Sequence, residues 1–326
     1  ITQDSDGGIH IRGGRSSEVV YMVDGVSMTD SYDGGLSVAI ENNTIQELQV
    51  ISGTFNAEYG RAMSGIINMV TKDGSNEFEG SLKTFTGDHI SQDSRYRDLN
   101  SYDALNHKNL EVQFSGPIIK DKLTFFISGR TYNSNGWLSG LNTFNMYGDT
   151  LDVIKYRPMN WIDKWSLHSK LTYTFSPNTK IKFKSIANRE EFQGYDHYRQ
   201  LTQEGRATEY NVGNFIGFNF SHAFSSRAYM DLNLSQHTKQ YESYLFKDPY
   251  DSRYVTQDSL YYAHIVGTLP DWAEEGTNYF PSYSYARWGV DLNRFRRETI
   301  TRQVKLDYTH QINTYNQVKA GVDFQP

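Results

Sequence analysis

Residues 164–176 read Lys-Trp-Ser-Leu-His-Ser-Lys-Leu-Thr-Tyr-Thr-Phe-Ser, and large apolar side chains alternate with polar ones over most of this stretch. Alternation with a period of two residues is typical of a β-strand whose two faces meet different surroundings. A shift of one residue would place Lys170 on the apolar face, so the pattern also determines which face is which. The stretch therefore predicts a strand with one apolar and one polar face.

Eight other ranges show the same alternation, so we expect nine strands in all. They lie at about 78–87, 109–117, 121–133, 164–176, 179–192, 211–224, 227–243, 298–313 and 316–325. Alternate links between them are short and rich in turn-forming residues. The other links are long, at about 88–108, 134–163, 190–210 and 244–297. Outer-membrane β-barrels connect their strands in this way, whereas a soluble β-sandwich or propeller would have short links at both ends.

The composition agrees with a barrel. The chain has 326 residues, a formal net charge of −6, 14% aromatic residues and no cysteine, and its mean hydropathy is −0.64. Disulfides and thiolate metal sites are thereby excluded, and the acidic balance argues against a nucleic-acid partner, which would favour a basic patch. No run approaches the roughly 18–20 apolar residues of a membrane helix. Low hydropathy with many aromatics suits a transmembrane β-barrel, in which every second residue is free to be polar.

Two features suggest that the chain is part of something larger. Barrels of this class have an even number of strands, and unpaired strand edges are not tolerated in lipid. Nine strands therefore predict a fragment of a larger barrel.

The charge also divides the chain, because residues 1–75 have four basic and ten acidic side chains while the remainder is balanced. We expect a separate domain at 1–75, with the strands at 76–326.

Five motifs in the first 75 residues occur in a fixed order. They are Ile9-His10-Ile11-Arg12-Gly13-Gly14, Val20-Tyr21-Met22-Val23-Asp24-Gly25-Val26, Ile45-Gln46-Glu47-Leu48-Gln49-Val50-Ile51-Ser52-Gly53, Ala57-Glu58-Tyr59-Gly60 and Gly65-Ile66-Ile67-Asn68 with Val70-Thr71-Lys72. As residues, they predict three short buried strands separated by glycine-rich turns in a small α+β unit. As a set, they closely resemble the plug domain of TonB-dependent outer-membrane receptors and transporters. The sequences of these motifs are similar to those of the Bacteroidota-type branch of the family. Ser115–Leu123 resembles the second barrel hairpin of the family.

The resemblance implies an all-β transmembrane antiparallel barrel, of which this chain supplies about nine strands of a probable 22, around the C-terminal part of an α+β plug. The segment that couples to TonB would lie before residue 1. The implied function is binding of a scarce ligand outside and its import into the periplasm, driven through TonB and its inner-membrane motor proteins. Outer-membrane lipid, a small ligand, glycan or peptide, and a surface lipoprotein are the other candidate partners, and the location is the cell outer membrane of a Gram-negative bacterium. We expect no enzymatic activity and no cofactor.

Several plug residues have roles that the resemblance suggests. Arg12 is similar to half of a lock that pairs with barrel glutamates, and Arg61 is a substitute for the second lock arginine; an ordinary exposed arginine is the alternative. Asp24 and Gly25 suit a tight turn after a strand, and Gly60 and Gly65 suit close backbone approach. The motif residues that we single out are Asp24, Gly25, Glu58, Tyr59, Gly60, Gly65, Asn68 and Lys72.

Ligand contacts are predicted in two loops. The irregular stretch 27–43 contains Asp30, Tyr32 and Asp33, and is either the floor of an external cavity or a solvated linker. The long link 244–297 is rich in aromatics, which suit stacking on sugars, peptides or flat chelates, or else pack the loop against itself or lie at the membrane interface. The candidates there are Tyr254, Tyr261, Tyr262, Trp272 and Trp288.

No catalytic or metal-binding pattern is found. The nine histidines lack a clustered ligand spacing, and the Walker, GxGxxG, GxSxG and HExxH motifs are absent from the sequence. Two other functional interpretations stay open: a non-transporting surface barrel for adhesion or assembly of partner proteins, and a soluble β-rich enzyme. The identity of the ligand does not follow from the sequence.

Overall fold

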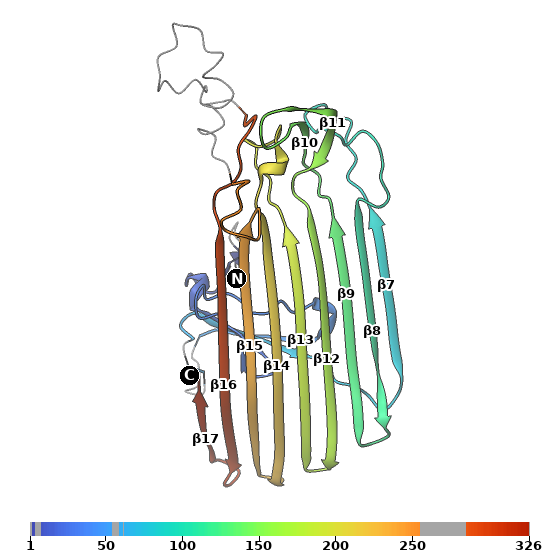
Figure 1. Cartoon of the computed structure of the whole chain (residues 1–326). Coiled ribbons are helices and arrows are strands. Elements are labelled where there is room, and N and C mark those ends of the chain that lie inside the picture. The colour runs from blue at the N-terminus through green and yellow to red at the C-terminus, as the bar shows by residue number, and fades with distance from the viewer. Residues whose placement is uncertain (1, 4–7, 54–58, 61, 255–284, 326) are drawn as a thin grey trace, which may run out of the picture.

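The computed structural model describes residues 2–3, 8–53, 59–60, 62–254 and 285–325. A large antiparallel sheet forms a wall, and a small domain packs against one side of it near mid-height (Figure 1). Short turns join the strands at one end of the wall and long links join them at the other (Figure 1). No α-helix long and apolar enough to cross a lipid bilayer occurs among the described residues.

The wall has nine strands in the order β17-β16-β15-β14-β13-β12-β9-β8-β7, and every neighbouring pair is antiparallel. Their bounds are β7 Glu79–Gly87, β8 His107–Ile119, β9 Leu123–Ser134, β12 Ile162–Ser176, β13 Thr179–Phe192, β14 Thr208–Ser225, β15 Ala228–Tyr244, β16 Phe295–Gln311 and β17 Gln317–Phe324. Each range predicted from alternation overlaps one of these strands.

The link at 135–161 differs from the expectation. The sequence predicts only a long connection there, but the structure has a hairpin of β10 (Ser139–Phe144) and β11 (Thr150–Pro158). This hairpin lies beyond the wall at the end with the long links (Figure 1). β10 has only six residues, and β11 has the adjacent apolar pair Val153 and Ile154, so neither strand shows the strict alternation by which the wall strands are found.

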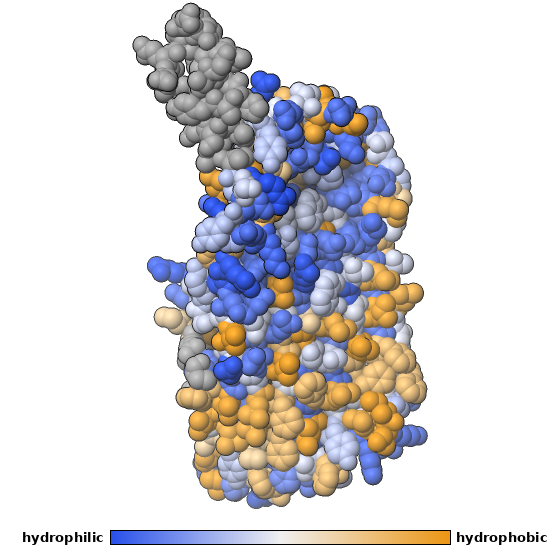
Figure 2. Space-filling model, viewed as in Figure 1, coloured by the Kyte–Doolittle hydropathy of each residue, from blue (hydrophilic) through white to orange (hydrophobic). Residues whose placement is uncertain are grey.

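The two faces of the wall have opposite character. On β12, Trp165 and Leu171 are exposed, whereas the alternating residues His168 and Lys170 are buried on the side of the small domain. The exposed apolar residues gather in a band over the half of the wall near the short turns (Figure 2). They include Val112, Phe114, Ile127, Leu171, Tyr173, Phe175, Phe183, Phe218, Phe224, Leu234, Val304, Leu306 and Tyr308. An apolar band on the outer face and polar groups on the inner face are typical of a membrane barrel.

We call the small domain the plug. Its elements are β1 Thr2–Gln3, β2 Ile9–His10, η1 Ser16–Glu18, β3 Val19–Val23, β4 Val26–Ser27, η2 Asn42–Thr44, β5 Ile45–Ile51 and β6 Gly65–Thr71. Strands β4-β3-β6-β5 form one sheet, in which β3 and β6 are parallel. This corrects two expectations: the sheet has four strands rather than three, and the described part of the plug has 3₁₀ turns but no α-helix. The extra strand, β4, has two residues and is added by the turn that follows β3.

Strand β3 is buried on both faces, which explains its unbroken apolar sequence. Val20 and Met22 pack on Ile66 of β6. Val19, Tyr21 and Val23 belong to a larger cluster on the other face. Two wall residues, Ile186 of β13 and Phe215 of β14, complete that cluster. The plug is therefore held to the wall partly by a shared apolar core.

Candidate functional site

A tight turn places a carboxylate at the plug surface. Asp24 and Gly25 connect β3 to β4 with φ angles of 49° and 80°, the left-handed pair of a type I′ turn. The sequence predicts this turn, but not the position of the aspartate side chain. Asp24 Oδ1 accepts a hydrogen bond from the Thr71 backbone N–H at 2.8 Å, and Oδ2 accepts one from the Thr71 hydroxyl at 2.7 Å. These bonds fix the carboxylate against the end of β6.

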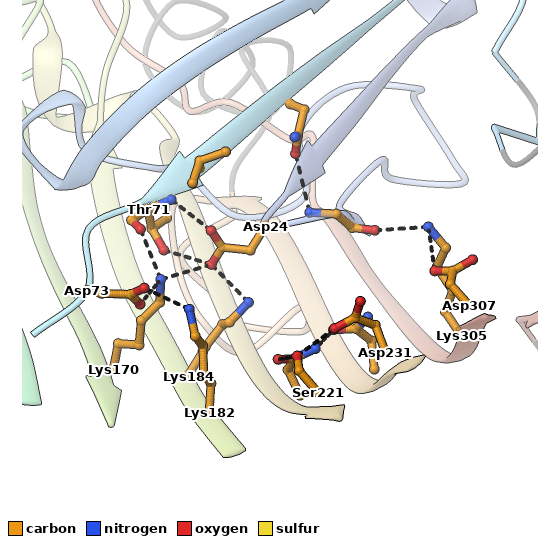
Figure 3. A pocket seen from close by; sticks show the side chains of 15 residues that line it. Asp24, Thr71, Asp73, Lys170, Lys182, Lys184, Ser221, Asp231, Lys305 and Asp307 are labelled. Atoms are coloured by element: carbon orange, nitrogen blue, oxygen red, sulfur yellow. Dashed lines mark hydrogen bonds and ion pairs between the residues drawn. The ribbon is translucent and has the colours of Figure 1, made fainter. Parts of the chain in front are cut away.

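Three wall lysines meet the carboxylates of Asp24 and Asp73 (Figure 3). Lys184 Nζ lies 2.9 Å from Asp24 Oδ2, and Lys170 Nζ lies 3.3 Å from the same oxygen. Lys170 also lies 2.9 Å from Asp73 Oδ1 and donates to the Thr71 carbonyl at 2.9 Å. Lys182 lies 2.7 Å from Asp73 Oδ2. We call these five residues the lysine latch: Asp24, Asp73, Lys170, Lys182 and Lys184.

The latch is an electrostatic unit rather than a set of separate pairs. Lys170 and Lys184 are direct partners in the β12–β13 register, and like charges directly opposite each other destabilise a sheet. Only 1% of the Lys170 side chain is exposed, and a buried charge needs a partner of opposite sign. The plug supplies that partner, so wall and plug each lack a stable charge arrangement without the other.

The pKa values of the two carboxyls reflect this arrangement. Burial acts to raise the pKa of Asp24, but the charges of Lys184 and Lys170 and the Thr71 hydrogen bond outweigh it and hold that pKa well below its usual value. Burial likewise acts to raise the pKa of Asp73, and Lys170 and Lys182 together lower it. Both groups are therefore carboxylates at neutral pH.

A cavity of about 410 Å³ lies between the plug and the wall, and all five latch residues border it (Figure 3). Most of its lining residues have polar or charged side chains, and its wall residues all come from the halves of β12–β16 near the short turns. Lys305 of β16 reaches the Gly25 carbonyl at 3.4 Å and Asp307 at 3.4 Å. On the neighbouring strands, Ser221 donates to Asp231. The cavity is thus a hydrophilic space beneath the plug, on the side of the short turns.

A second ionic contact holds the plug loop that precedes η2. Lys239 of β15 lies 2.9 Å from Asp33 and 3.4 Å from Asp30, and Arg297 of β16 lies 3.0 Å and 3.2 Å from the same two carboxylates. Asp30 is 1% exposed. Tyr32, between them, is 68% exposed with the Arg297 guanidinium 4.3 Å from its ring centre. In this structure the two aspartates fasten the loop to the wall, and Tyr32 is left accessible.

A third contact lies at β8 and β9. Arg130 Nη1 is 2.5 Å from Glu41 Oε2 of the plug, and its Nε is 3.4 Å from Glu111 of the wall. Gln113 donates to the Asn43 carbonyl at 2.7 Å. All three contacts place acidic plug residues against basic wall residues, which accounts for the excess negative charge of residues 1–75.

The comparison with known families agrees with this architecture. Residues 2–66 match the TonB-dependent Receptor Plug Domain family. Residues 2–66 therefore form a TonB-dependent receptor plug domain. Over 131 residues it is 32% identical to the TonB-dependent transporter Oar of Myxococcus xanthus, a match that covers 38% of this chain and 12% of that protein. The resemblance to the Bacteroidota-type branch stays a prediction.

Solved structures of TonB-dependent receptors share the fold. The outer membrane transporter YddB from Escherichia coli matches 98% of this chain with a TM-score of 0.62 at 12% identity, and 42% of that protein is covered. The FrpB iron transporter from Neisseria meningitidis (F3-3 variant) matches 95% of the chain with a TM-score of 0.57 at 13% identity, with 41% covered. The chain thus spans less than half the length of these proteins, and identities this low establish the fold alone.

The predicted lock arginines have different outcomes. Arg12 lies in a turn after β2 with a φ of 53°, and it is exposed. Within the described ranges it forms no salt bridge, so its role as a lock stays a prediction. Arg61 and Glu58 lie outside the described residues. The structure instead brings lysines and two arginines of the wall, Arg130 and Arg297, against plug carboxylates.

The remaining motif residues support the plug in different ways. A Cβ atom on Gly65 would lie 2.4 Å from Ile11, so close approach requires glycine there, whereas Gly60 has no atom within 4 Å of such a Cβ. Among the described residues, none therefore requires close approach at Gly60, and that role stays a prediction. Asn68 accepts from the Gly25 N–H, and Lys72 donates to Gln113 of the wall at 3.4 Å. Tyr59 packs against the smaller core cluster.

The two described aromatic candidates of the last long link, Tyr254 and Trp288, are engaged within the protein. Trp288 is 8% exposed and packs over Gly148 of the β10–β11 hairpin. Tyr254 accepts from the Phe246 N–H and donates to the Phe246 carbonyl through its hydroxyl, and Arg294 covers its ring at 4.2 Å. Both residues therefore pack the links in this structure. Tyr261, Tyr262 and Trp272 lie outside the described residues.

Acidification is expected to loosen the plug. Burial acts to raise the pKa of Asp33, but Lys239, the Gly35 N–H and Arg297 lower it to about 2; the pKa values of Asp24 and Asp73 are lowered as well. A carboxyl whose pKa is lower in the seated state stabilises that state above its free pKa, and the contribution disappears as the pH falls through the seated pKa. We therefore expect seating to weaken between about pH 4 and pH 2.

The measurement uses a spin label on a Gln46→Cys variant of the full-length protein, since Gln46 is exposed on β5 and this chain has no other cysteine. The urea concentration at which the label becomes mobile defines the plug-release midpoint. The midpoint should be constant from pH 7 to pH 5 and fall sharply below pH 4. A midpoint that rises on acidification would contradict the assignment of these carboxylates as fasteners.

Proposed function

We propose that this chain is the plug and part of the barrel of a TonB-dependent outer-membrane transporter, which binds a scarce ligand outside the cell and imports it into the periplasm with energy delivered through TonB. The supporting observation is the plug–wall interface, in which acidic plug residues meet basic wall residues in three separate contacts. Ionic contacts of this kind suit a plug that blocks a lumen and is able to leave it.

The orientation follows from the band of apolar residues. We place the band in the lipid, which puts the short turns in the periplasm and the long links outside. The β10–β11 hairpin and the other long links then form an outer cap. The domains are the plug at 1–75 and barrel strands at 76–326, and we propose that a complete barrel has about 22 strands and lies in the outer membrane of a Gram-negative bacterium.

The interface is suited to reversible opening. Ion pairs and hydrogen bonds exchange for contacts with water at a much smaller net cost than their strength in isolation suggests, whereas a large apolar core would resist rewetting. The polar cavity beneath the latch already provides hydrophilic space on the periplasmic side. Force applied to the plug through TonB would therefore widen an existing polar space.

The proposed ligand surface lies above the plug. Tyr32 is its accessible aromatic residue on the plug side, while Asp30 and Asp33 hold the loop in place. Arg12 and Arg61 stay proposed lock residues toward other parts of a complete barrel. The ligand is a small compound, glycan or peptide, and a surface lipoprotein is a further proposed partner.

The test compares what cells remove from a defined medium. Wild-type cells, cells without this gene and cells without TonB are grown in the same medium, and the dissolved compounds that remain are measured. We expect at least one compound that wild-type cells deplete and both mutants leave behind. If everything that disappears through this protein also disappears without TonB, the transport proposal is wrong, and a non-transporting surface barrel is favoured.

A further inference from the structure

Two histidines that are distant in the sequence meet at the end of the wall with the long links. His89 follows β7 and His107 begins β8, and the loop between them brings His89 Nδ1 to 2.8 Å from His107 Nε2. The ring centres are 4.6 Å apart and the rings are inclined by 51°. The spacing of the histidines in the sequence does not indicate this pair, which forms only through the fold.

The pair belongs to the inner side of the wall. His107 has the same alternation phase as Asn109 and Glu111 of β8. Glu111 accepts a hydrogen bond from Asn43 of the plug, so this phase faces the plug side. His89 is exposed and His107 is partly exposed. The two imidazoles are therefore accessible from the space above the plug.

The surrounding residues hold both histidines in place. Asp88 accepts from the backbone N–H of His89 at 2.8 Å and from that of Asp103 at 2.7 Å, which closes the loop at its base. His107 Nδ1 lies 2.7 Å from Ser134 Oγ, and this oxygen also accepts the Gly136 N–H at 3.0 Å. When His107 Nδ1 donates to Ser134, its Nε2 presents a lone pair toward His89.

Such an arrangement has the features of a metal site. Metal-binding histidines usually donate their other ring N–H to a fixed acceptor, which sets the tautomer; Ser134 is in that position. Two nitrogens each about 2.0–2.1 Å from one metal ion are separated by about 2.9 Å at a right angle and about 3.3 Å in a tetrahedron. The observed 2.8 Å is close to the right-angle value and about 0.5 Å shorter than the tetrahedral one, so a small rotation of the exposed His89 ring suffices for the right-angle geometry.

We propose that His89 and His107 bind a divalent late transition-metal ion, namely Cu²⁺, Ni²⁺ or Zn²⁺, at the outer entrance of the receptor. Imidazole is a preferred ligand for these ions. No group of three or more His, Asp or Glu side chains in the described part of the chain is placed to hold a metal. The ion would therefore keep open positions for water, as expected of a site that captures and releases it.

The test is binding of Cu²⁺ alone to the purified full-length protein in detergent, followed by calorimetry and by electron paramagnetic resonance. We expect one site in which the copper spectrum shows coupling to two imidazole nitrogens. His89→Ala and His107→Ala should each weaken that binding at least 10-fold. Ser134→Ala should weaken it about 10-fold while both nitrogens stay coordinated, because the hydroxyl orients rather than binds.

His197→Ala is the matched control. His197 is also exposed in a long link, and its Nδ1 lies 2.8 Å from the hydroxyl of Tyr195 rather than from a second histidine. This variant should bind Cu²⁺ as the wild type does, and circular dichroism verifies that all variants are folded. The proposal is overturned if the wild type binds no copper at millimolar concentration, or if the His89 and His107 variants bind as tightly as the control. TonB is absent from the measurement, so the outcome is independent of the transport test.

Discussion

Replacing Lys170 with alanine is expected to release the plug from the wall of the full-length protein at a much lower urea concentration. The substitution removes the ammonium group that Asp24, Asp73 and the Thr71 carbonyl share. Each carboxylate then keeps only one of its two ammonium partners, and the Thr71 carbonyl loses its donor. Breaking a buried ion pair by removing one partner typically costs about 3–5 kcal/mol. With a urea dependence of about 1–3 kcal/mol per molar for a small domain, the release midpoint should fall by at least about 1 M.

Lys182→Ala is the control for this experiment. Lys182 contacts only Asp73 within the latch and is 26% exposed, so its loss should cost no more than about 1 kcal/mol. Cells that carry Lys170→Ala should also become sensitive to a large antibiotic that the intact outer membrane excludes, whereas Lys182→Ala cells should not. Equal midpoints for the two variants would show that Lys170 does not hold the plug.

The sequence predicts the wall well because the wall is built from local information. Each strand needs only the alternation of its own residues, and the short turns fix the register of each hairpin. The β10–β11 hairpin escapes prediction because it lies outside the apolar band and has no lipid-facing side to impose the pattern. The same lack of local pattern explains the missed strand β4, whose two residues depend on the turn before them.

The lysine latch could have been found from the sequence in part. A turn at 176–179 sets Lys170 opposite Lys184 on the polar face of a hairpin, an unfavourable pairing unless an anion lies between the two ammonium groups. The acidic excess of residues 1–75 indicates where such an anion comes from. Which aspartate supplies it depends on how the plug is placed on the wall, and no local rule determines that placement.

Other parts of the site depend wholly on tertiary structure. The family resemblance points to Arg12, but the turn after β2 leaves that side chain exposed. Trp288 suits ligand stacking by residue type, yet it is buried against a hairpin that the sequence does not reveal. Residue type therefore indicates what a side chain is able to bind, and only the packing decides whether a ligand reaches it.

Phe215 stands out in the sequence, because it is a large aromatic residue at a position of β14 where the alternation predicts a polar side chain. Its side chain is 1% exposed, lies over Gly217 on the same strand, and completes the core that the wall shares with β3. Phe215→Ala should cost about 3–5 kcal/mol of seating free energy, through lost burial and the cavity left behind. The release midpoint should therefore fall about as far as in Lys170→Ala. The shift should be independent of pH between 7 and 3, because no charge is removed.

Phe218→Ala separates seating from the stability of the wall itself. Phe218 is on the same strand with the opposite phase, is 37% exposed, and belongs to the outward apolar band. Its replacement should leave the plug-release midpoint unchanged while it weakens insertion in lipid. If Phe215→Ala and Phe218→Ala shift the midpoint equally, the shared core does not hold the plug, and its seating rests on the ionic contacts alone. If only Phe215→Ala shifts it, an apolar core and an ionic latch act together, and under the proposed function a pull through TonB would have to overcome both.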